Sequence, residues 1–203
     1  GNGASGEMWH GGLVHIAGSR AVVLRDCVIS NTRLNGVSVM NGSARVESCD
    51  ISGSALTGLF VYDCDGVIAQ ANRIHDCDNG GIRIWRGENG PDGAIVSGNR
   101  IWNIGWTGGG NGQNGNGVNI FRADGVIVSD NYITDCAFSA VRLNSTNNTQ
   151  VRGNTCFNSG EVAIFSEFTF SGSVIANNIV DNAAAGISMT NFNEHGRLAT
   201  CTG

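Results

Sequence analysis

The sequence predicts an all-β protein, a right-handed parallel β-helix (a single-stranded solenoid) of about eight coils. Three observations predict this fold. Two apolar residues separated by one residue recur about every 23 positions, an Asn recurs at one place in the repeat, and the 203 residues include 31 Gly but only 1 Pro. Internal repeats of about 20–50 residues are typical of solenoids and related repeat architectures.

The apolar pairs define the coil length. Because side chains alternate along a strand, both apolar members of a pair lie on one face. Successive pairs are 23, 22, 23, 36, 23, 23 and 23 residues apart, counted from Val14, Val37, Leu59, Ile82, Val118, Val141, Ile164 and Ile187. Three short strands per coil account for this step, and stacked coils bury an apolar face that one coil cannot bury alone. We expect a column of stacked isoleucines inside: Ile29, Ile51, Ile74, Ile101 and Ile133.

In a second pattern, an Asn recurs at the same position of the repeat, where we expect a bend of the coil. The recurring residues are Asn72, Asn99, Asn131, Asn154 and Asn178. An Asn at the same bend of every coil can hydrogen-bond to neighbouring coils and satisfy backbone groups that the bend leaves unpaired.

Cysteines occupy the Asn slot in the first two coils, and others replace apolar residues. We expect buried, reduced thiols at Cys27, Cys49, Cys77, Cys136 and Cys156, since a buried Cys packs as a small apolar residue. A disulfide between the stacked Cys27 and Cys49 is the alternative. The seven cysteines contain no CxxC pair, so zinc is not predicted.

Composition excludes several classes of protein. The net charge is −5, only 14 % of residues are charged, and every basic residue is Arg, so nucleic-acid binding is not predicted. No apolar run approaches the ~20 residues that span a membrane. The sequence shows no signal peptide, so any export signal was removed or lay upstream.

We predict one domain over residues 1–203, with two insertions in the fourth coil. They cover residues 86–93 and the glycine-rich residues 105–116, and they account for the 36-residue step. Long loops on a rigid scaffold often carry function; a tolerated surface insertion is the alternative. No cap is evident after residues 200–203, so we expect either further coils of a longer parent chain or self-association there.

The outward positions of the first strand in each coil form a candidate binding surface. Alternation predicts an aromatic column of Tyr62, Trp85 and Phe121. It also predicts a polar column of Arg83, Asn119 and Arg142, with Asn144 and Glu167 at one end. Solvent-facing strand positions do not need Trp or Phe for stability, so this stripe indicates binding. The alternative is that the two insertions fold over the aromatic residues and bury them.

The coil pattern resembles the pectate-lyase-like right-handed β-helix superfamily over nearly the whole chain. Shorter stretches resemble the bacterial twin-arginine-translocated repeat proteins: residues 9–15, 119–122, 135–142, 160–163 and 190–194. This second resemblance implies a periplasmic or secreted protein that is part of a longer chain and has no established activity. The superfamily's polysaccharide lyases use an Arg or Lys base on this strand face, often with Ca²⁺ bridging substrate and acidic residues. Glu167 is the only carboxylate in the outward columns here, which argues against Ca²⁺.

Three functions remain open at this stage, and the sequence does not decide whether the protein is an enzyme. The first is a lyase or epimerase acting on an acidic polysaccharide. It would use Arg83 or Arg142 as base, Tyr62 as acid, and Glu167 or Asn144 for positioning. The second is a non-catalytic protein that binds such a polymer through Trp85, Asn119, Phe121 and Asn144. The third is a structural or assembly module. No cofactor and no metal site are predicted, and Ca²⁺ is the alternative.

Overall fold

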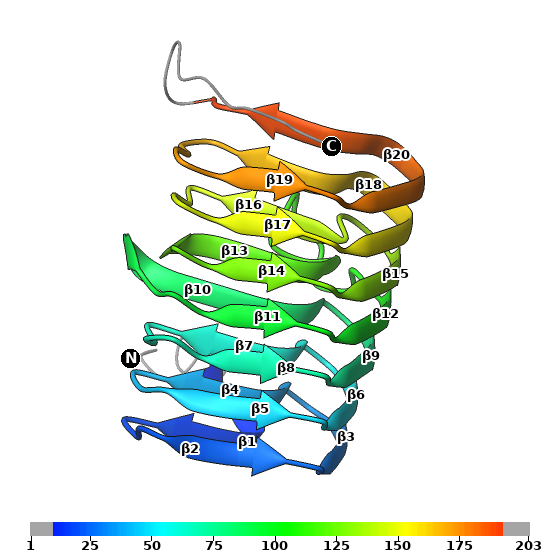
Figure 1. The fold of residues 1–203 in the computed structure, drawn as a ribbon. Coiled ribbons are helices and arrows are strands. Elements are labelled where there is room, and N and C mark those ends of the chain that lie inside the picture. The colour runs from blue at the N-terminus through cyan, green and yellow to red at the C-terminus, as the bar shows by residue number, and fades with distance from the viewer. Residues whose placement is uncertain (1–9, 193–203) are drawn as a thin grey trace, which may run out of the picture.

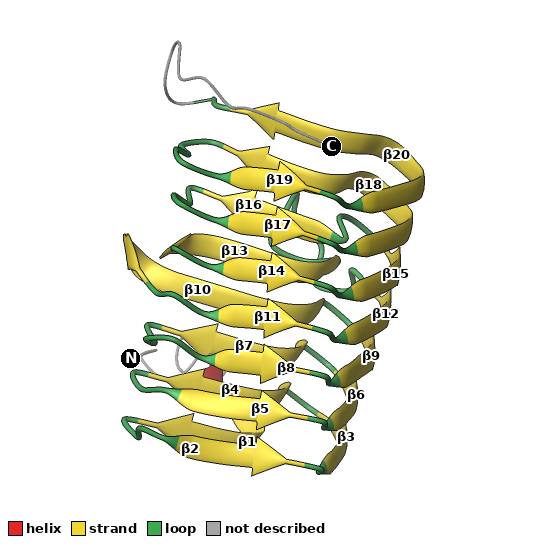
Figure 2. Cartoon of the chain, viewed as in Figure 1, coloured by secondary structure: helices red, strands yellow, loops and turns green. Residues whose placement is uncertain are grey.

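The computed structural model describes residues 10–192, which form a rod of stacked coils (Figure 1). Each coil passes over three faces, mostly as three strands separated by bends, and near the C-terminal end a single strand covers two of the faces. Each strand pairs in parallel with its copies in the adjacent coils (Figure 2). Eight strands stack on one face of the rod. The predicted right-handed parallel β-helix of about eight coils is confirmed.

We call the three faces of the rod A, B and C. Face A consists of β1 (Gly12–Ala17), β4 (Asn35–Met40), β7 (Thr57–Tyr62), β10 (Gly80–Pro91), β13 (Asn116–Asp124), β16 (Val141–Asn144) and the C-terminal parts of β18 (Thr155–Glu167) and β20 (Ile179–Thr190). Face B consists of β2 (Val22–Arg25), β5 (Ala44–Glu47), β8 (Ile68–Gln70), β11 (Ile95–Ser97), β14 (Ile127–Ser129), β17 (Gln150–Arg152) and β19 (Val174–Ala176). Face C consists of β3 (Val28–Thr32), β6 (Asp50–Ser54), β9 (Arg73–Cys77), β12 (Arg100–Ile104), β15 (Tyr132–Cys136) and the N-terminal parts of β18 and β20.

The core is the predicted column of isoleucines, extended by the apolar residues of faces A and B. Ile101 stacks in register between Ile74 and Ile133, and all three are fully buried. Cys156 continues the column above Ile133. Because each coil buries its apolar face against the next, the stack needs no second layer of secondary structure.

The predicted Asn ladder is confirmed at the bend between faces B and C. The Asn99 Nδ2 donates to Oδ1 of Asn131 at 2.9 Å and to the carbonyl of Ala69 at 3.0 Å, while Oδ1 of Asn131 also accepts from the backbone N of Asn99 at 2.9 Å. The same contacts join Asn131 to Asn154. The ladder satisfies the buried backbone groups that the bend removes from the strand pairing.

The described cysteines are free thiols, so the disulfide alternative for Cys27 and Cys49 is wrong. Cys49, Cys77, Cys136 and Cys156 are buried as predicted, whereas Cys27 at the bend between β2 and β3 is only half-buried. Burial raises the pKa of Cys77 to about 11 and that of Cys156 to about 12, which keeps these thiols protonated and unreactive.

The two insertions differ in structure. The first was expected to be a loop, but β10 continues through it to Pro91. After a register shift, Gly90 and Pro91 pair with Ala123 and Asp124 of β13, which is also lengthened. Pairing satisfies backbone groups that a loop would leave to solvent. The second insertion is irregular from Gly105 to Gly115. The predicted open end at residues 200–203 lies outside the described residues. Among residues 10–192, no helix is long and apolar enough to cross a membrane.

Candidate functional site

A cavity of about 550 Å³ opens on face A between the glycine-rich insertion and the strands of coils four to seven. Its lining is Trp85, Asn111, Gly112, Gln113, Asn119, Phe121, Arg142, Asn144, Glu167 and Phe168. Six of the eight residues that the sequence predicted for the site therefore lie together. Arg83 and Tyr62 do not line the cavity.

The predicted columns are present in register. Arg83 pairs with Asn119 and Asn119 with Arg142 across β10, β13 and β16. Trp85 pairs in the same way with Phe121, which stands beside Asn144, and Asn144 stands beside Glu167 of β18. Parallel pairing without a slip keeps side chains at equivalent positions on one face, so the repeat itself brings these residues together.

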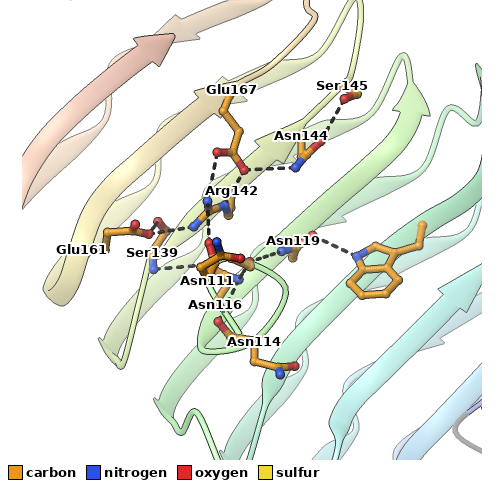
Figure 3. A network of polar contacts seen from close by, with 12 residues as sticks. Asn111, Asn114, Asn116, Asn119, Ser139, Arg142, Asn144, Ser145, Glu161 and Glu167 are labelled. Atoms are coloured by element: carbon orange, nitrogen blue, oxygen red, sulfur yellow. Dashed lines mark hydrogen bonds and ion pairs between the residues drawn. The ribbon is translucent and has the colours of Figure 1, made fainter. Parts of the chain in front are cut away.

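The glycine-rich insertion covers the polar column (Figure 3). The carbonyl of Gly112 accepts hydrogen bonds from Nδ2 of Asn116 at 2.8 Å and from Nδ2 of Asn119 at 3.2 Å. Arg83 donates from Nη2 to Oδ1 of Asn114 at 2.5 Å. The insertion is thus held on face A by side chains of the very columns that the sequence predicted to face solvent.

The expected exposure of the polar column is consequently wrong. Arg83, Asn119, Arg142 and Glu167 are each exposed by 6 % or less. The aromatic Trp85, Phe121 and Tyr62 are half-buried. The alternation of side chains correctly identified the residues that point outward. It gives no information about which other segments of the chain cover these residues.

Arg142 is held by two carboxylates. Its Nε and Nη2 donate to Oε1 and Oε2 of Glu167 at 2.7 and 3.0 Å, and its Nη1 donates to Glu161 at 2.7 Å. Nδ2 of Asn144 donates to Oε1 of Glu167 at 3.1 Å (Figure 3). A guanidinium in a bidentate pair with a carboxylate stays charged, so this arrangement suits Arg142 for holding charge and not for accepting a proton.

Arg83 lies deeper, beneath Trp85 and Asn114. Its guanidinium carbon is 4.9 Å from the centroid of the Trp85 ring, and its Nη2 donates to the carbonyl of Asn79 at 2.9 Å. Burial lowers the pKa of Arg83 to about 10, because the charged form is desolvated. Tyr62 stacks against Phe60 and His10 on the far side of Trp85, outside the cavity.

Aromatic rings form one wall of the cavity. The Trp85 Nε1 donates to Oδ1 of Asn119 at 2.9 Å, which fixes the indole against the polar column. Phe121 meets Trp85 edge-on, with ring centroids 5.8 Å apart. The guanidinium carbon of Arg122 lies over the Phe121 ring, 4.8 Å from its centroid. The wall presents apolar ring surface next to amide and carboxylate groups.

A sequence model described as the right-handed β-helix region matches residues 11–112 and 110–202. The chain belongs to the right-handed β-helix family. The family match does not extend to the twin-arginine-translocated repeat proteins, so that resemblance stays a prediction. A comparison by sequence with characterised proteins gives no significant match.

Three solved structures show the same architecture as this β-helix. The A-module of mannuronan C-5 epimerase AlgE6 of Azotobacter vinelandii has a TM-score of 0.68 at 14 % identity, over 86 % of this chain and 56 % of that one. A mutant of the periplasmic alginate epimerase AlgG has a TM-score of 0.55 at 12 % identity, over 86 % and 47 %. The A-module of AlgE4 of the same organism has 0.50 at 12 %, over 91 % and 65 %. These likenesses show the fold, and this β-helix spans about half the length of the first two proteins.

The sequence prediction did not name four lining residues: three belong to the glycine-rich insertion, Asn111, Gly112 and Gln113, and the fourth is Phe168. Phe168 follows the face A strand β18 and has a backbone φ of 64°. The residue after a face A strand takes a positive φ in most coils, usually as Gly18, Asn41 or Asp63, types that tolerate this conformation. A Phe at such a corner is strained, and strain of this kind is often kept at functional sites. The presence of Phe168, where other coils have Gly, Asn or Asp, was the sequence signal that pointed to this residue.

Cation binding has no structural support in the described part of the chain. No group of three or more His, Cys, Asp or Glu side chains is close enough there to hold a metal ion. Within the cavity, Glu167 is already engaged by Arg142 and Asn144.

Proposed function

We propose that this β-helix binds an acidic polysaccharide in the face A cavity, outside the cytoplasm. The observation that carries the proposal is the union of an aromatic wall with a row of polar side chains in one cavity. Rings of Trp85 and Phe121 suit stacking against the C–H faces of sugars. The side chains of Asn119 and Asn144 line the same cavity, and amides are groups that hydrogen-bond to sugar hydroxyls.

The charges beside the cavity favour an acidic polymer. Among the described residues, neither Arg83 nor Arg122 forms an ion pair with a carboxylate. Glu161 and Glu167 both pair with Arg142, so that guanidinium is already neutralised. Trp85 and Asn114 cover Arg83, which leaves Arg122, over the Phe121 ring, for an acidic ligand. An unpaired guanidinium binds a carboxylate more readily than a neutral group.

The solved structures support the same class of ligand. The proteins that this β-helix resembles in fold are epimerases of mannuronan or alginate, and AlgG is periplasmic. Mannuronan and alginate are polyuronates, which fits the guanidinium of Arg122 beside the aromatic wall. The likeness rests on the fold and covers about half of each of these two proteins, so substrate and location are parts of the proposal.

Catalysis as a lyase or epimerase is the second candidate, favoured by that likeness. It would need a base and an acid at the sugar ring. Of the predicted catalytic residues, only Arg142 and Glu167 line the cavity, and they neutralise each other. Arg83 has the lowered pKa that suits a base, but Trp85 and Asn114 cover it. Binding is therefore better supported than turnover.

Calorimetry with oligomannuronate, oligogalacturonate and a neutral maltooligosaccharide tests the proposal. We expect the acidic oligomers to bind and the neutral one to bind more weakly. Replacing Trp85 with Ala should weaken binding by about 1–3 kcal/mol per folded molecule, and Trp85→Phe should weaken it less. Absence of binding to both acidic oligomers, or full binding by Trp85→Ala, contradicts the proposal. Formation of unsaturated or C5-inverted uronate in the same mixtures, read by proton NMR, would establish the second candidate.

A further inference from the structure

We propose a second binding surface for an acidic saccharide chain, on face C around Trp102. This goes beyond the proposed function, because face C is a different side of the rod from the face A cavity. A hollow of about 270 Å³ lies here, lined by Arg73, Arg100, Trp102, Tyr132 and Thr134. All five are outward residues of β9, β12 and β15, three consecutive strands of face C.

The hollow contains a rigid aromatic platform. The ring of Trp102 stacks on His75 of the preceding coil, with centroids 4.1 Å apart and an angle of 7° between the rings. His75 is in turn held by Asp76 at 2.6 Å and by Asp50 at 3.1 Å. An aromatic side chain whose orientation is already fixed loses little entropy when a ligand stacks on it.

A second ring extends the platform along the rod. Tyr132 stands one coil further, 40 % exposed, and its ring centroid is 5.9 Å from that of Phe157. Solvent-facing strand positions gain little stability from large aromatic side chains, and adjacent exposed rings mark binding surfaces more often than isolated ones do. Trp102 and Tyr132 offer two stacking surfaces on adjacent coils, which suits an extended chain of sugars.

Two guanidinium groups give the surface its preference for an acid. Arg100 is exposed, lies 5.6 Å over the Tyr132 ring, and has no carboxylate within ion-pair distance among the described residues. Arg73 lies 5.6 Å over Trp102 and pairs with Asp50 at 3.3 Å. A guanidinium beside a stacking ring can pair with the carboxylate of the same sugar that the ring holds. Arg100 therefore gives the surface a higher affinity for uronates than for neutral sugars.

Affinity electrophoresis in gels that contain alginate tests the surface, with gels containing neutral dextran as the reference. We expect Trp102→Ala to weaken retardation about tenfold, the loss of one stacked ring, and Arg100→Gln to weaken it about threefold. Arg152→Gln is the matched control, because it removes the same charge from an exposed position of β17 on face B. Its retardation should equal that of the unaltered protein. Since Arg100 is exposed, its variant tests the surface even if Trp102→Ala does not fold.

The face A variant Trp85→Ala separates the two proposals. If Trp85→Ala alone abolishes retardation, face C does not bind and the inference is overturned, while the proposed function stands. If Trp102→Ala and Arg100→Gln weaken retardation and Trp85→Ala does not, face C binds and the face A proposal fails. Partial losses in each single variant and complete loss in the double variant support both sites, because two sites on one polymer act with combined affinity. Equal losses for Arg100→Gln and Arg152→Gln, or equal retardation by dextran, overturn the inference.

Discussion

Gly112 of the glycine-rich insertion packs directly on the guanidinium of Arg142. A Cβ at position 112 would lie 2.7 Å from Nη2 and 2.8 Å from Cζ of that side chain. Arg142 cannot swing aside at low cost, because Glu167 and Glu161 hold its nitrogens. The absence of a side chain at 112 therefore lets the insertion lie close against face A and forms one side of the cavity.

Replacing Gly112 with Ala should lift the insertion from Arg142 and reshape the cavity. We expect affinity for an acidic oligosaccharide to fall about tenfold, with a loss of stability of about 1 kcal/mol because the strands beneath stay paired. Gly90→Ala is the control in the first insertion, since a Cβ there meets only Arg86, at an ordinary 3.6 Å. Calorimetry and urea unfolding give the two values. Unchanged affinity in Gly112→Ala would show that the insertion does not shape the binding site.

The ion pair between Arg142 and Glu167 should dominate the stability of this region. Glu167→Gln removes a buried charge and leaves a buried guanidinium short of its partner, so we expect a loss of about 3 kcal/mol in the free energy of unfolding. Glu161→Gln touches the same guanidinium, but its side chain is 35 % exposed, and we expect a loss of about 0.5 kcal/mol. Urea denaturation measures both. Equal losses would mean that burial does not set the strength of these two contacts.

Phe168 should contribute to oligosaccharide binding in the cavity while its strained backbone lowers the stability of the fold. Phe168→Asn places a residue that tolerates positive φ at the strained corner, so relief of about 1 kcal/mol of strain offsets much of the lost packing against Phe192. We expect a melting temperature within a few degrees of the original and a severalfold loss of oligosaccharide affinity. Ala71→Asn relieves a similar φ of 55° away from the cavity and should leave affinity unchanged. A Phe168→Asn protein that binds fully would remove Phe168 from the site.

Asp92 should make stability depend on pH. Burial raises the pKa of Asp92 from 3.8 to about 6, so between these values the folded state binds a proton that the unfolded state lacks. The stabilisation from this group is complete below pH 4 and is lost as the pH rises through about 6, by about 3 kcal/mol. Asp92→Asn keeps an oxygen to accept from the backbone N of Ala94 and should lack this loss.

Thermal unfolding of the two proteins from pH 4.5 to 7.5 checks this prediction. Other carboxylates, such as Asp76 beside His75, have lowered pKa values and stabilise the fold as the pH rises. The difference between the original protein and Asp92→Asn isolates position 92. A constant difference over this range would contradict a raised pKa for Asp92.

The sequence alone determined the coil and what points into and out of it. Because strand side chains alternate and parallel pairing repeats without slipping, a 23-residue step was enough to predict the stack of Ile74, Ile101 and Ile133 and the contacts of Asn99 with Asn131. The same periodicity placed Trp85 beside Phe121 and Asn119 beside Arg142. These are local, repetitive properties that one-dimensional periodicity encodes.

Only the tertiary structure decided what covers those columns and how their charges pair. The insertion before β13 has no repeat to predict its path, and its fold over face A converts the expected solvent-facing Arg142 and Glu167 into a buried pair. The lengthened β10 depends on a partner extension in β13, and Phe168 enters the cavity from a strained corner. Each outcome rests on contacts between segments without a common period, so periodicity could not predict it.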